Sequence, residues 1–77
     1  MEWVPLKSRM LAAASYRADW QQLYLRFRSG DVYCYRGVPA ERYLELLAAD
    51  SKGRYFREHI RNGYPYQRIR PSALAAS

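Results

Sequence analysis

The chain has 77 residues, which is the size of one small domain and too short for a two-domain enzyme. A total of 13 Lys and Arg against 7 Asp and Glu gives a formal net charge of +6, which favours a polyanionic partner without identifying it. The single cysteine, Cys34, excludes an internal disulfide, and no Cys and His residues have metal-site spacing. With no long apolar run and no leader segment, we expect a cytoplasmic protein with no membrane partner, cofactor or metal.

Three strands are predicted in the first half of the chain. Residues 10–16 favour a strand weakly, whereas residues 23–27 alternate apolar and polar side chains as a half-buried strand does. Gly30 supplies the positive φ that a tight turn needs, so residues 32–36 are expected to pair antiparallel with residues 23–27.

A helix is predicted over residues 40–49, directly after Pro39. Proline ends the preceding strand and presets φ for the first helical turn. The apolar residues of this segment recur at helical spacing and are expected to form one packed side: Tyr43, Leu44, Leu46 and Leu47.

A second helix is predicted over residues 52–62. Ser51 has the side chain of an N-cap, and Gly63 stands where a glycine commonly ends a helix. Pro65 prevents continuation, and residues 66–70 are compatible with a short fourth strand at the sheet edge.

The predicted fold is therefore α+β. It is a small antiparallel β-meander of three or four strands, followed by two helices that pack on one face of the sheet, since neither layer can bury its apolar side alone. We expect a single domain over residues 6–70 and a flexible C-terminal tail over residues 71–77.

The positive charge is concentrated toward the C-terminal end. Residues 52–70 hold six basic side chains and one acidic side chain, Glu58. Three arginines recur at helical spacing on the side predicted to face outward: Arg54, Arg57 and Arg61. Guanidinium groups bind phosphate through paired hydrogen bonds, which favours nucleic acid, although a solvated helix face with Glu58 partly neutralising its neighbours fits the pattern equally.

The orientation of Tyr33 and Tyr35 depends on the preceding turn. If the turn is residues 29–30, Phe27 pairs with residue 32 and both tyrosines point outward, where nucleic-acid bases can stack on them. Three arginines would flank such a platform: Arg26, Arg28 and Arg36. If the turn is residues 29–31, Phe27 pairs with Tyr33 and both tyrosines belong to the core. The sequence leaves both alternatives open.

No set of catalytic residues is evident. His59 falls on the apolar side of the second predicted helix and is expected to be a packed, hydrogen-bonded imidazole. Cys34 is expected to be a small buried residue. Tyr64 and Tyr66 either fix a loop to the body of the domain or stack on a ligand. We therefore predict that the protein is not an enzyme.

Over residues 6–69 the chain resembles the KTSC domain, a small module of bacterial proteins that also occurs at the C-terminus of some lysyl-tRNA synthetases. The resemblance rests on three motifs in order: Tyr33-Cys34-Tyr35, Val38-Pro39, and the Ser-x-Gly-x-Tyr-Phe pattern of residues 51–56. It implies RNA binding, proposed for the family from its synthetase fusions, with Tyr33 and Tyr35 as site residues. The chain departs from the family pattern at Ser8-Arg9, Ser15-Tyr16-Arg17 and Arg57, so its added arginines are interpreted as its own specialisation.

The predicted function is a small non-catalytic module that binds RNA, with tRNA as one candidate. The alternative is a protein-interaction module that docks an acidic or larger partner, because Arg and Tyr are enriched at protein interfaces too. The oligomeric state stays open. The predicted RNA-binding residues are Arg26, Arg28, Tyr33, Tyr35, Arg36, Arg54, Arg57 and Arg61.

Overall fold

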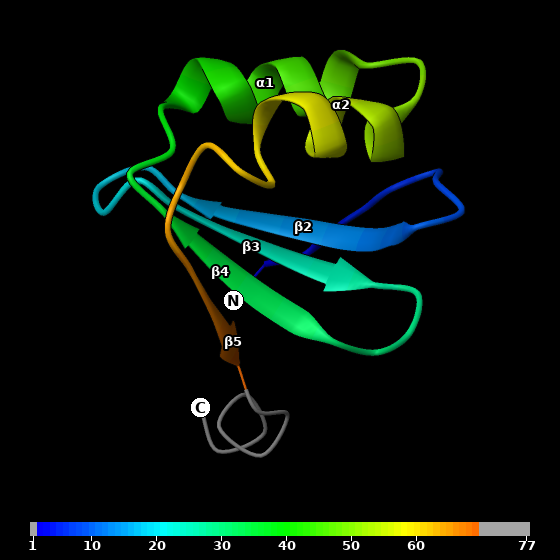
Figure 1. Ribbon diagram of the computed structural model, residues 1–77, viewed down its shortest axis with the longest axis horizontal. Helices are drawn as coiled ribbons and strands as arrows, with labels where there is room; N and C mark the ends of the chain where they lie inside the picture. Colours follow the sequence, from blue (N-terminus) through cyan, green and yellow to red (C-terminus); the bar gives the residue numbers. More distant parts are fainter. Residues whose placement is uncertain (1, 70–77) are drawn as a thin grey trace.

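A five-stranded antiparallel sheet carries two helices on one of its faces in the computed structural model, which describes residues 2–69 (Figure 1). The strands lie side by side in chain order: β1 (Val4–Pro5), β2 (Leu11–Arg17), β3 (Gln22–Phe27), β4 (Val32–Arg36) and β5 (Tyr66–Ile69). The helices α1 (Ala40–Ala48) and α2 (Lys52–His59) lie between β4 and β5 in the chain. The predicted α+β fold is confirmed. Strand β1 was not predicted, and the expected tail over residues 71–77 lies outside the described residues.

The core lies between the sheet and the helices. It is built from inward-facing residues of the strands and helices and from residues of the segments that flank them: Leu6, Leu11, Ala14, Leu23, Leu25, Tyr35, Val38, Leu46, Phe56 and Ile60. The predicted packed side of the first helix is partly wrong, because Leu44 is 61% exposed. At about 100° per residue, Leu44 stands roughly 200° from the buried Leu46 around the helix axis. Neither α1 nor α2 is long and apolar enough to cross a lipid bilayer.

The turn between β3 and β4 sets the orientation of the two β4 tyrosines. The N–H of Phe27 donates to the carbonyl of Asp31 at 2.8 Å, and the N–H of Gly30 donates to the carbonyl of Phe27 at 2.9 Å. The turn therefore consists of residues 28–30, with Gly30 at a φ of +98°. Leu25 pairs with Tyr33, and the remaining pairs follow in register.

Both predicted turns are thus wrong in their limits. The two-residue turn differs from the observed register by one residue and would place Tyr33 and Tyr35 on the opposite face. The three-residue turn over 29–31 differs by two residues, and a shift of two preserves the face. The inward orientation of Tyr33 and Tyr35 that this turn predicted is therefore the one observed.

Helix α2 begins as predicted and ends earlier. The Oγ atom of Ser51 accepts a hydrogen bond from the N–H of Arg54 at 3.3 Å, which confirms the predicted N-cap. The predicted end at residue 62 is wrong, because the N–H groups of Ile60 and Arg61 both donate to the Phe56 carbonyl and close the last turn there. Gly63 follows in a separate turn and does not have a positive φ.

A polar cluster joins the two helices on their outer side. The Tyr55 hydroxyl donates to Oε1 of Glu45, and the Arg42 guanidinium donates to the same carboxylate at 3.3 Å. The hydrogen bond from Tyr55 lowers the pKa of Glu45, with Arg42 acting in the same direction. These contacts help to fix the position of α2 relative to α1.

Arg28 connects the β3–β4 turn to the segment that joins β1 and β2. Its Nε donates to the Ser8 carbonyl at 3.0 Å, and a terminal nitrogen donates to the Leu6 carbonyl at 2.9 Å. The two carbonyls lie 20 and 22 residues away in the chain, so the side chain acts as a cross-link within the fold.

We expect Arg28→Gln to lower the free energy of unfolding by about 1–2 kcal/mol, because two hydrogen bonds from a charged donor are lost near the surface. Urea unfolding followed by circular dichroism measures this change. Arg36→Gln is the matched control, since Arg36 is exposed and should change stability by less than about 0.5 kcal/mol. Equal stability of the two variants would contradict the cross-linking role of Arg28.

Candidate functional site

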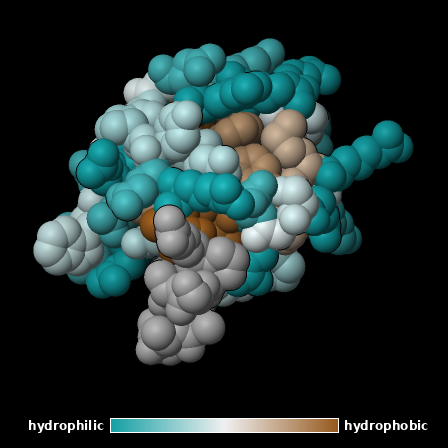
Figure 2. All heavy atoms as spheres, turned by 60° about the horizontal axis from the view of Figure 1, so that its bottom comes forward, coloured by the Kyte–Doolittle hydropathy of each residue, from teal (hydrophilic) through white to brown (hydrophobic). Residues whose placement is uncertain are grey.

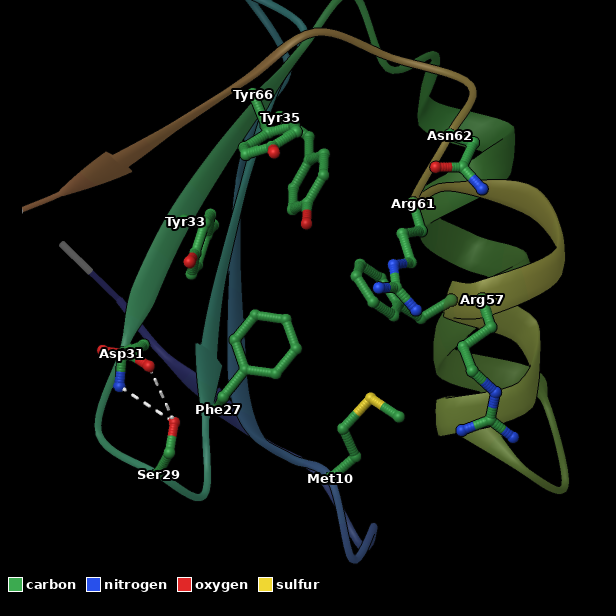
Figure 3. A pocket seen from close by; sticks show the side chains of 11 residues that line it. Met10, Phe27, Ser29, Asp31, Tyr33, Tyr35, Arg57, Arg61, Asn62 and Tyr66 are labelled. Carbon is green, nitrogen blue, oxygen red and sulfur yellow. Dashed lines mark hydrogen bonds between the residues drawn. The ribbon is translucent and has the colours of Figure 1, made fainter.

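A cleft of about 440 Å³ opens between α2 and strands β3, β4 and β5 (Figure 3). Aromatic side chains contribute much of its lining: Phe27, Tyr33, Tyr35, Phe56 and Tyr66. In Figure 3 the labelled rings extend from the sheet toward α2, while Arg57 and Arg61 extend from the opposite side. We call this site the aromatic cleft.

The strand pattern places three tyrosines together in this cleft. Tyr33 and Tyr35 alternate along β4 and therefore share a face, and Tyr66 of β5 pairs directly with Tyr35. The ring centroid of Tyr66 lies 5.6 Å from each of the other two. Tyr35 is 4% exposed and belongs to the core, Tyr33 is half-buried, and Tyr66 is 58% exposed. The outermost ring, Tyr66, is therefore accessible to a ligand.

The Tyr35 hydroxyl stays protonated at neutral pH. Burial, together with the neighbouring Tyr33 and Tyr66 hydroxyls, raises the pKa of Tyr35 to about 12, against a smaller opposing effect of Arg61. A neutral phenol can both donate and accept a hydrogen bond, so the base of the cleft offers polar contacts without a negative charge.

The two arginines at the cleft carry free positive charge. Arg57 and Arg61 are exposed, and within residues 2–69 neither makes an ion pair. The cleft also contains one carboxylate, Asp31, whose Oδ1 is 2.9 Å from a terminal nitrogen of Arg68. Because Arg68 neutralises this carboxylate, the cleft presents a net positive charge to a ligand.

The structure brings together four of the eight predicted RNA-binding residues, Tyr33, Tyr35, Arg57 and Arg61. Arg54 lies nearer the start of α2 and lines a neighbouring hollow. Arg28 is engaged in the internal hydrogen bonds described above. Its side chain therefore has a structural role in the fold, and its predicted part in RNA binding stays a prediction.

Arg26 and Arg36 lie on the sheet face away from the helices. The Arg26 guanidinium sits 4.4 Å from the centroid of the Trp3 ring, and Arg36 shares its face with Cys34. The predicted platform of outward tyrosines beside these arginines is therefore wrong. Figure 2 shows the molecule from the side away from the helices, with a small hydrophobic area among hydrophilic residues.

Phe27, Phe56 and Asn62 line the cleft and were not among the predicted site residues. Phe27 lies six positions before Tyr33 in the chain, and the β3–β4 register brings their ring centroids to 5.7 Å. The available signal was the alternation of β3, which places Phe27 on the same face as Leu25. Asn62 carries no comparable sequence signal, because it lies in the turn beyond α2.

His59 and Cys34 have different environments. His59 was predicted to be a packed imidazole on the apolar side of the helix and is exposed, because Phe56 and Ile60 fill the space beneath α2. Its ring lies against that of Tyr55 at a tilt, with centroids 4.5 Å apart. Cys34 is buried as predicted, at 5% exposed beside its β3 neighbour Tyr24. Burial raises the pKa of the Cys34 thiol, which opposes a role as a nucleophile.

We expect native Cys34 to react with iodoacetamide at about pH 8 at least about tenfold more slowly than in the unfolded chain, because burial restricts access and disfavours the thiolate. Mass spectrometry of timed, quenched samples with and without guanidinium measures the two rates. Equal rates would show that the thiol is accessible and reactive in the folded protein.

Comparison with known proteins gives a consistent result. The family model described as KTSC domain matches residues 7–64. A protein of Tsukamurella paurometabola is 41% identical over 70 residues, covering 91% of this chain and 97% of the relative. A lysine–tRNA ligase of Nostoc sp. is 37% identical over 59 residues, which is 77% of this chain and 10% of the ligase. A crystal structure of a KTSC domain protein from Yersinia pestis has a TM-score of 0.87 at 29% identity, covering 90% of this chain and 97% of that one.

Proposed function

The chain belongs to the KTSC domain family, and from this premise we propose that it is a non-catalytic RNA-binding module whose ligand enters the aromatic cleft. One observation carries the proposal: the exposed Tyr66 ring of the sheet borders the same cleft as Arg57 and Arg61 on the α2 side, which make no ion pair within residues 2–69. The similarity to a segment of a lysine–tRNA ligase makes tRNA the first ligand to test. An RNA ligand of this kind would place the activity in the cytoplasm.

The composition of the cleft suits one unstacked nucleotide. A nucleic-acid base stacks on an aromatic ring with a gain of about 1–3 kcal/mol, and the exposed ring of Tyr66 offers such a surface. The guanidinium groups of Arg57 and Arg61 can each hold phosphate oxygens through charge-assisted hydrogen bonds. The volume of about 440 Å³ falls within the usual range of small-ligand pockets.

This binding mode gives affinity without strong sequence selectivity. Phosphate contacts carry no base information, and stacking accepts every base because each has a π-face. Affinity should fall with salt, because each neutralised phosphate releases counterions. We therefore propose a module that holds an RNA segment in place and leaves sequence choice to other contacts.

We expect Arg57→Glu combined with Arg61→Glu to abolish most of the RNA affinity, because two phosphate contacts become repulsive. For a single-stranded ligand, the loss of two contacts should also reduce the slope of log affinity against log salt by about 1.4. Fluorescence anisotropy with labelled tRNA and with an unrelated RNA, each at two salt concentrations, measures both effects.

Arg17→Glu combined with Arg36→Glu is the matched control for this experiment. It makes the same change in net charge on the sheet face away from the helices. There Arg17 of β2 and Arg36 of β4 are the two neighbours of Gln22 of β3. The control should lose much less affinity than the α2 double variant. Equal losses in the two variants would show that binding depends on net charge alone and would contradict a site at the cleft.

We expect Tyr66→Ala to weaken RNA binding by at least about fivefold, corresponding to about 1 kcal/mol or more of lost stacking. Tyr66 is 58% exposed but contacts two other rings, so we expect its removal to lower the free energy of unfolding by about 1 kcal/mol and to leave the protein folded. Tyr66→Phe retains the ring and should keep most of the affinity. Calorimetric titration separates the variants, and an unchanged affinity for Tyr66→Ala would exclude stacking on this ring.

The alternative function is docking to a protein partner. It is favoured by β5, which forms one edge of the sheet in the described part of the chain, and by the exposed Trp20 and Leu44. Recovery of the protein from its host with and without RNase treatment separates the two functions. A single stoichiometric protein partner that survives RNase supports docking, whereas RNase-sensitive recovery supports RNA binding.

A further inference from the structure

A second hollow of about 270 Å³ lies next to the aromatic cleft. One side comes from the segment between β1 and β2, including Lys7 and Arg9, and the other from the start of α2, including Lys52 and Arg54. Residues 7–10 and 50–54 are far apart in the chain and meet here. We call this site the basic hollow.

The basic hollow and the aromatic cleft are neighbours that share part of their lining. Met10 and Arg57 line both of them. Gly53 packs close to both residues, because a Cβ atom at this position would lie in ordinary van der Waals contact, 3.5 Å from Cε of Met10 and 3.8 Å from a terminal nitrogen of Arg57. Arg57 therefore stands between the two sites and can serve a ligand that occupies both.

The two sites differ in chemistry. Among the described residues, one carboxylate, Asp50, and no aromatic ring line the basic hollow. Five cationic side chains line it: Lys7, Arg9, Lys52, Arg54 and Arg57. Within residues 2–69, no ion pair involves any of these five. A base therefore has no stacking partner in the hollow, whereas a phosphate has several donors.

The segment that carries Lys7 and Arg9 has a fixed backbone. The Ser8 Oγ accepts hydrogen bonds from the N–H groups of Met10 and Leu11, each at 3.1 Å. Arg28 holds the carbonyls of Leu6 and Ser8 from the other side. Lys7 and Arg9 therefore project from a segment that is ordered before a ligand arrives, which reduces the entropy lost on binding.

We propose that the aromatic cleft and the basic hollow form one binding track for a single RNA strand, with one unstacked base in the cleft and the adjacent phosphates in the hollow. The proposal rests on the RNA-binding function proposed above. Such a track selects single strands, because bases inside a duplex are stacked and cannot enter an aromatic cleft. It also requires more than one nucleotide, since a mononucleotide fills only the cleft.

The test compares Lys7→Gln combined with Arg9→Gln with the unchanged protein. Both substituted residues are exposed and lie outside α2, so the cleft and its arginines stay intact. The ligands are a uridine mononucleotide, single-stranded oligouridylates of two to six nucleotides, and a six-base-pair RNA duplex. Binding is measured by calorimetry or anisotropy at two salt concentrations, with Arg17→Gln combined with Arg36→Gln as the matched control.

If the binding track exists, the Lys7 and Arg9 variant should bind the mononucleotide as tightly as the unchanged protein does, and the hexanucleotide more weakly than the unchanged protein does. Loss of two phosphate contacts lowers the salt slope by about 1.4, so the ratio of wild-type to variant affinity for the hexanucleotide should shrink about sevenfold from about 50 to about 200 mM salt. The control variant should show a smaller change in slope, and the duplex should bind more weakly than the single strand.

Two results would overturn the track and leave RNA binding in place. One is an unchanged hexanucleotide affinity and salt slope in the Lys7 and Arg9 variant while the Arg57 and Arg61 variant loses binding. The other is equal affinity for the duplex and the single strand. If the unchanged protein binds none of these RNAs or tRNA, the proposed function itself fails and the track fails with it.

Discussion

The pairing register between β3 and β4 decides which side chains meet at the candidate site. Gly30 adopts a φ of +98°, a conformation that L side chains rarely adopt, and this allows the three-residue turn over residues 28–30. Leu25 then faces Tyr33, and the β4 tyrosines lie on the helix side of the sheet. A slip of one residue would move both tyrosines to the face away from the helices and turn Cys34 toward the helices. The aromatic cleft thus depends on one turn.

The second half of the site depends on the placement of α2. The Ser51 cap fixes where the helix begins, and the buried side chain of Phe56 packs its inner side against the sheet. The contact between Tyr55 and Glu45 joins it to α1. With the helix fixed in this way, Arg57 and the nearby Arg61 lie opposite the tyrosines of the sheet. The rigid layers therefore supply the geometry, and the exposed side chains supply the chemistry.

Much of the fold could be predicted from local signals. The alternation of residues 23–27, the glycine of the following turn and the Ser51 cap each describe short-range physics, and the elements they predict are present. The limits of the turn could not be predicted, because two-residue and three-residue loops place glycine in similar positions. The end of α2 is set by the Ile60 and Arg61 N–H groups that share the Phe56 carbonyl, and no residue type in the sequence marks this change of backbone geometry.

The candidate site was less predictable than the fold. The arginines were predicted as RNA-binding residues from their charge and spacing. Charge does not reveal which guanidinium groups already have partners inside the protein. Arg28 donates to two carbonyls that are distant in the chain, and Arg26 stacks on Trp3, a residue of the segment before β1. Tyr35 and Tyr66 meet through a pairing between strands separated by both helices, which no local pattern reports.

That last pairing has a consequence for how the domain assembles. Strands β2, β3 and β4 form consecutive hairpins, whereas β5 joins β4 only after the chain has passed through both helices. Closing this longer loop costs more chain entropy than closing a hairpin turn. Because β5 carries Tyr66, the outer wall of the cleft is contributed by the segment whose docking is entropically the most demanding. Fraying at this edge would therefore widen the entrance while the central hairpins stay folded.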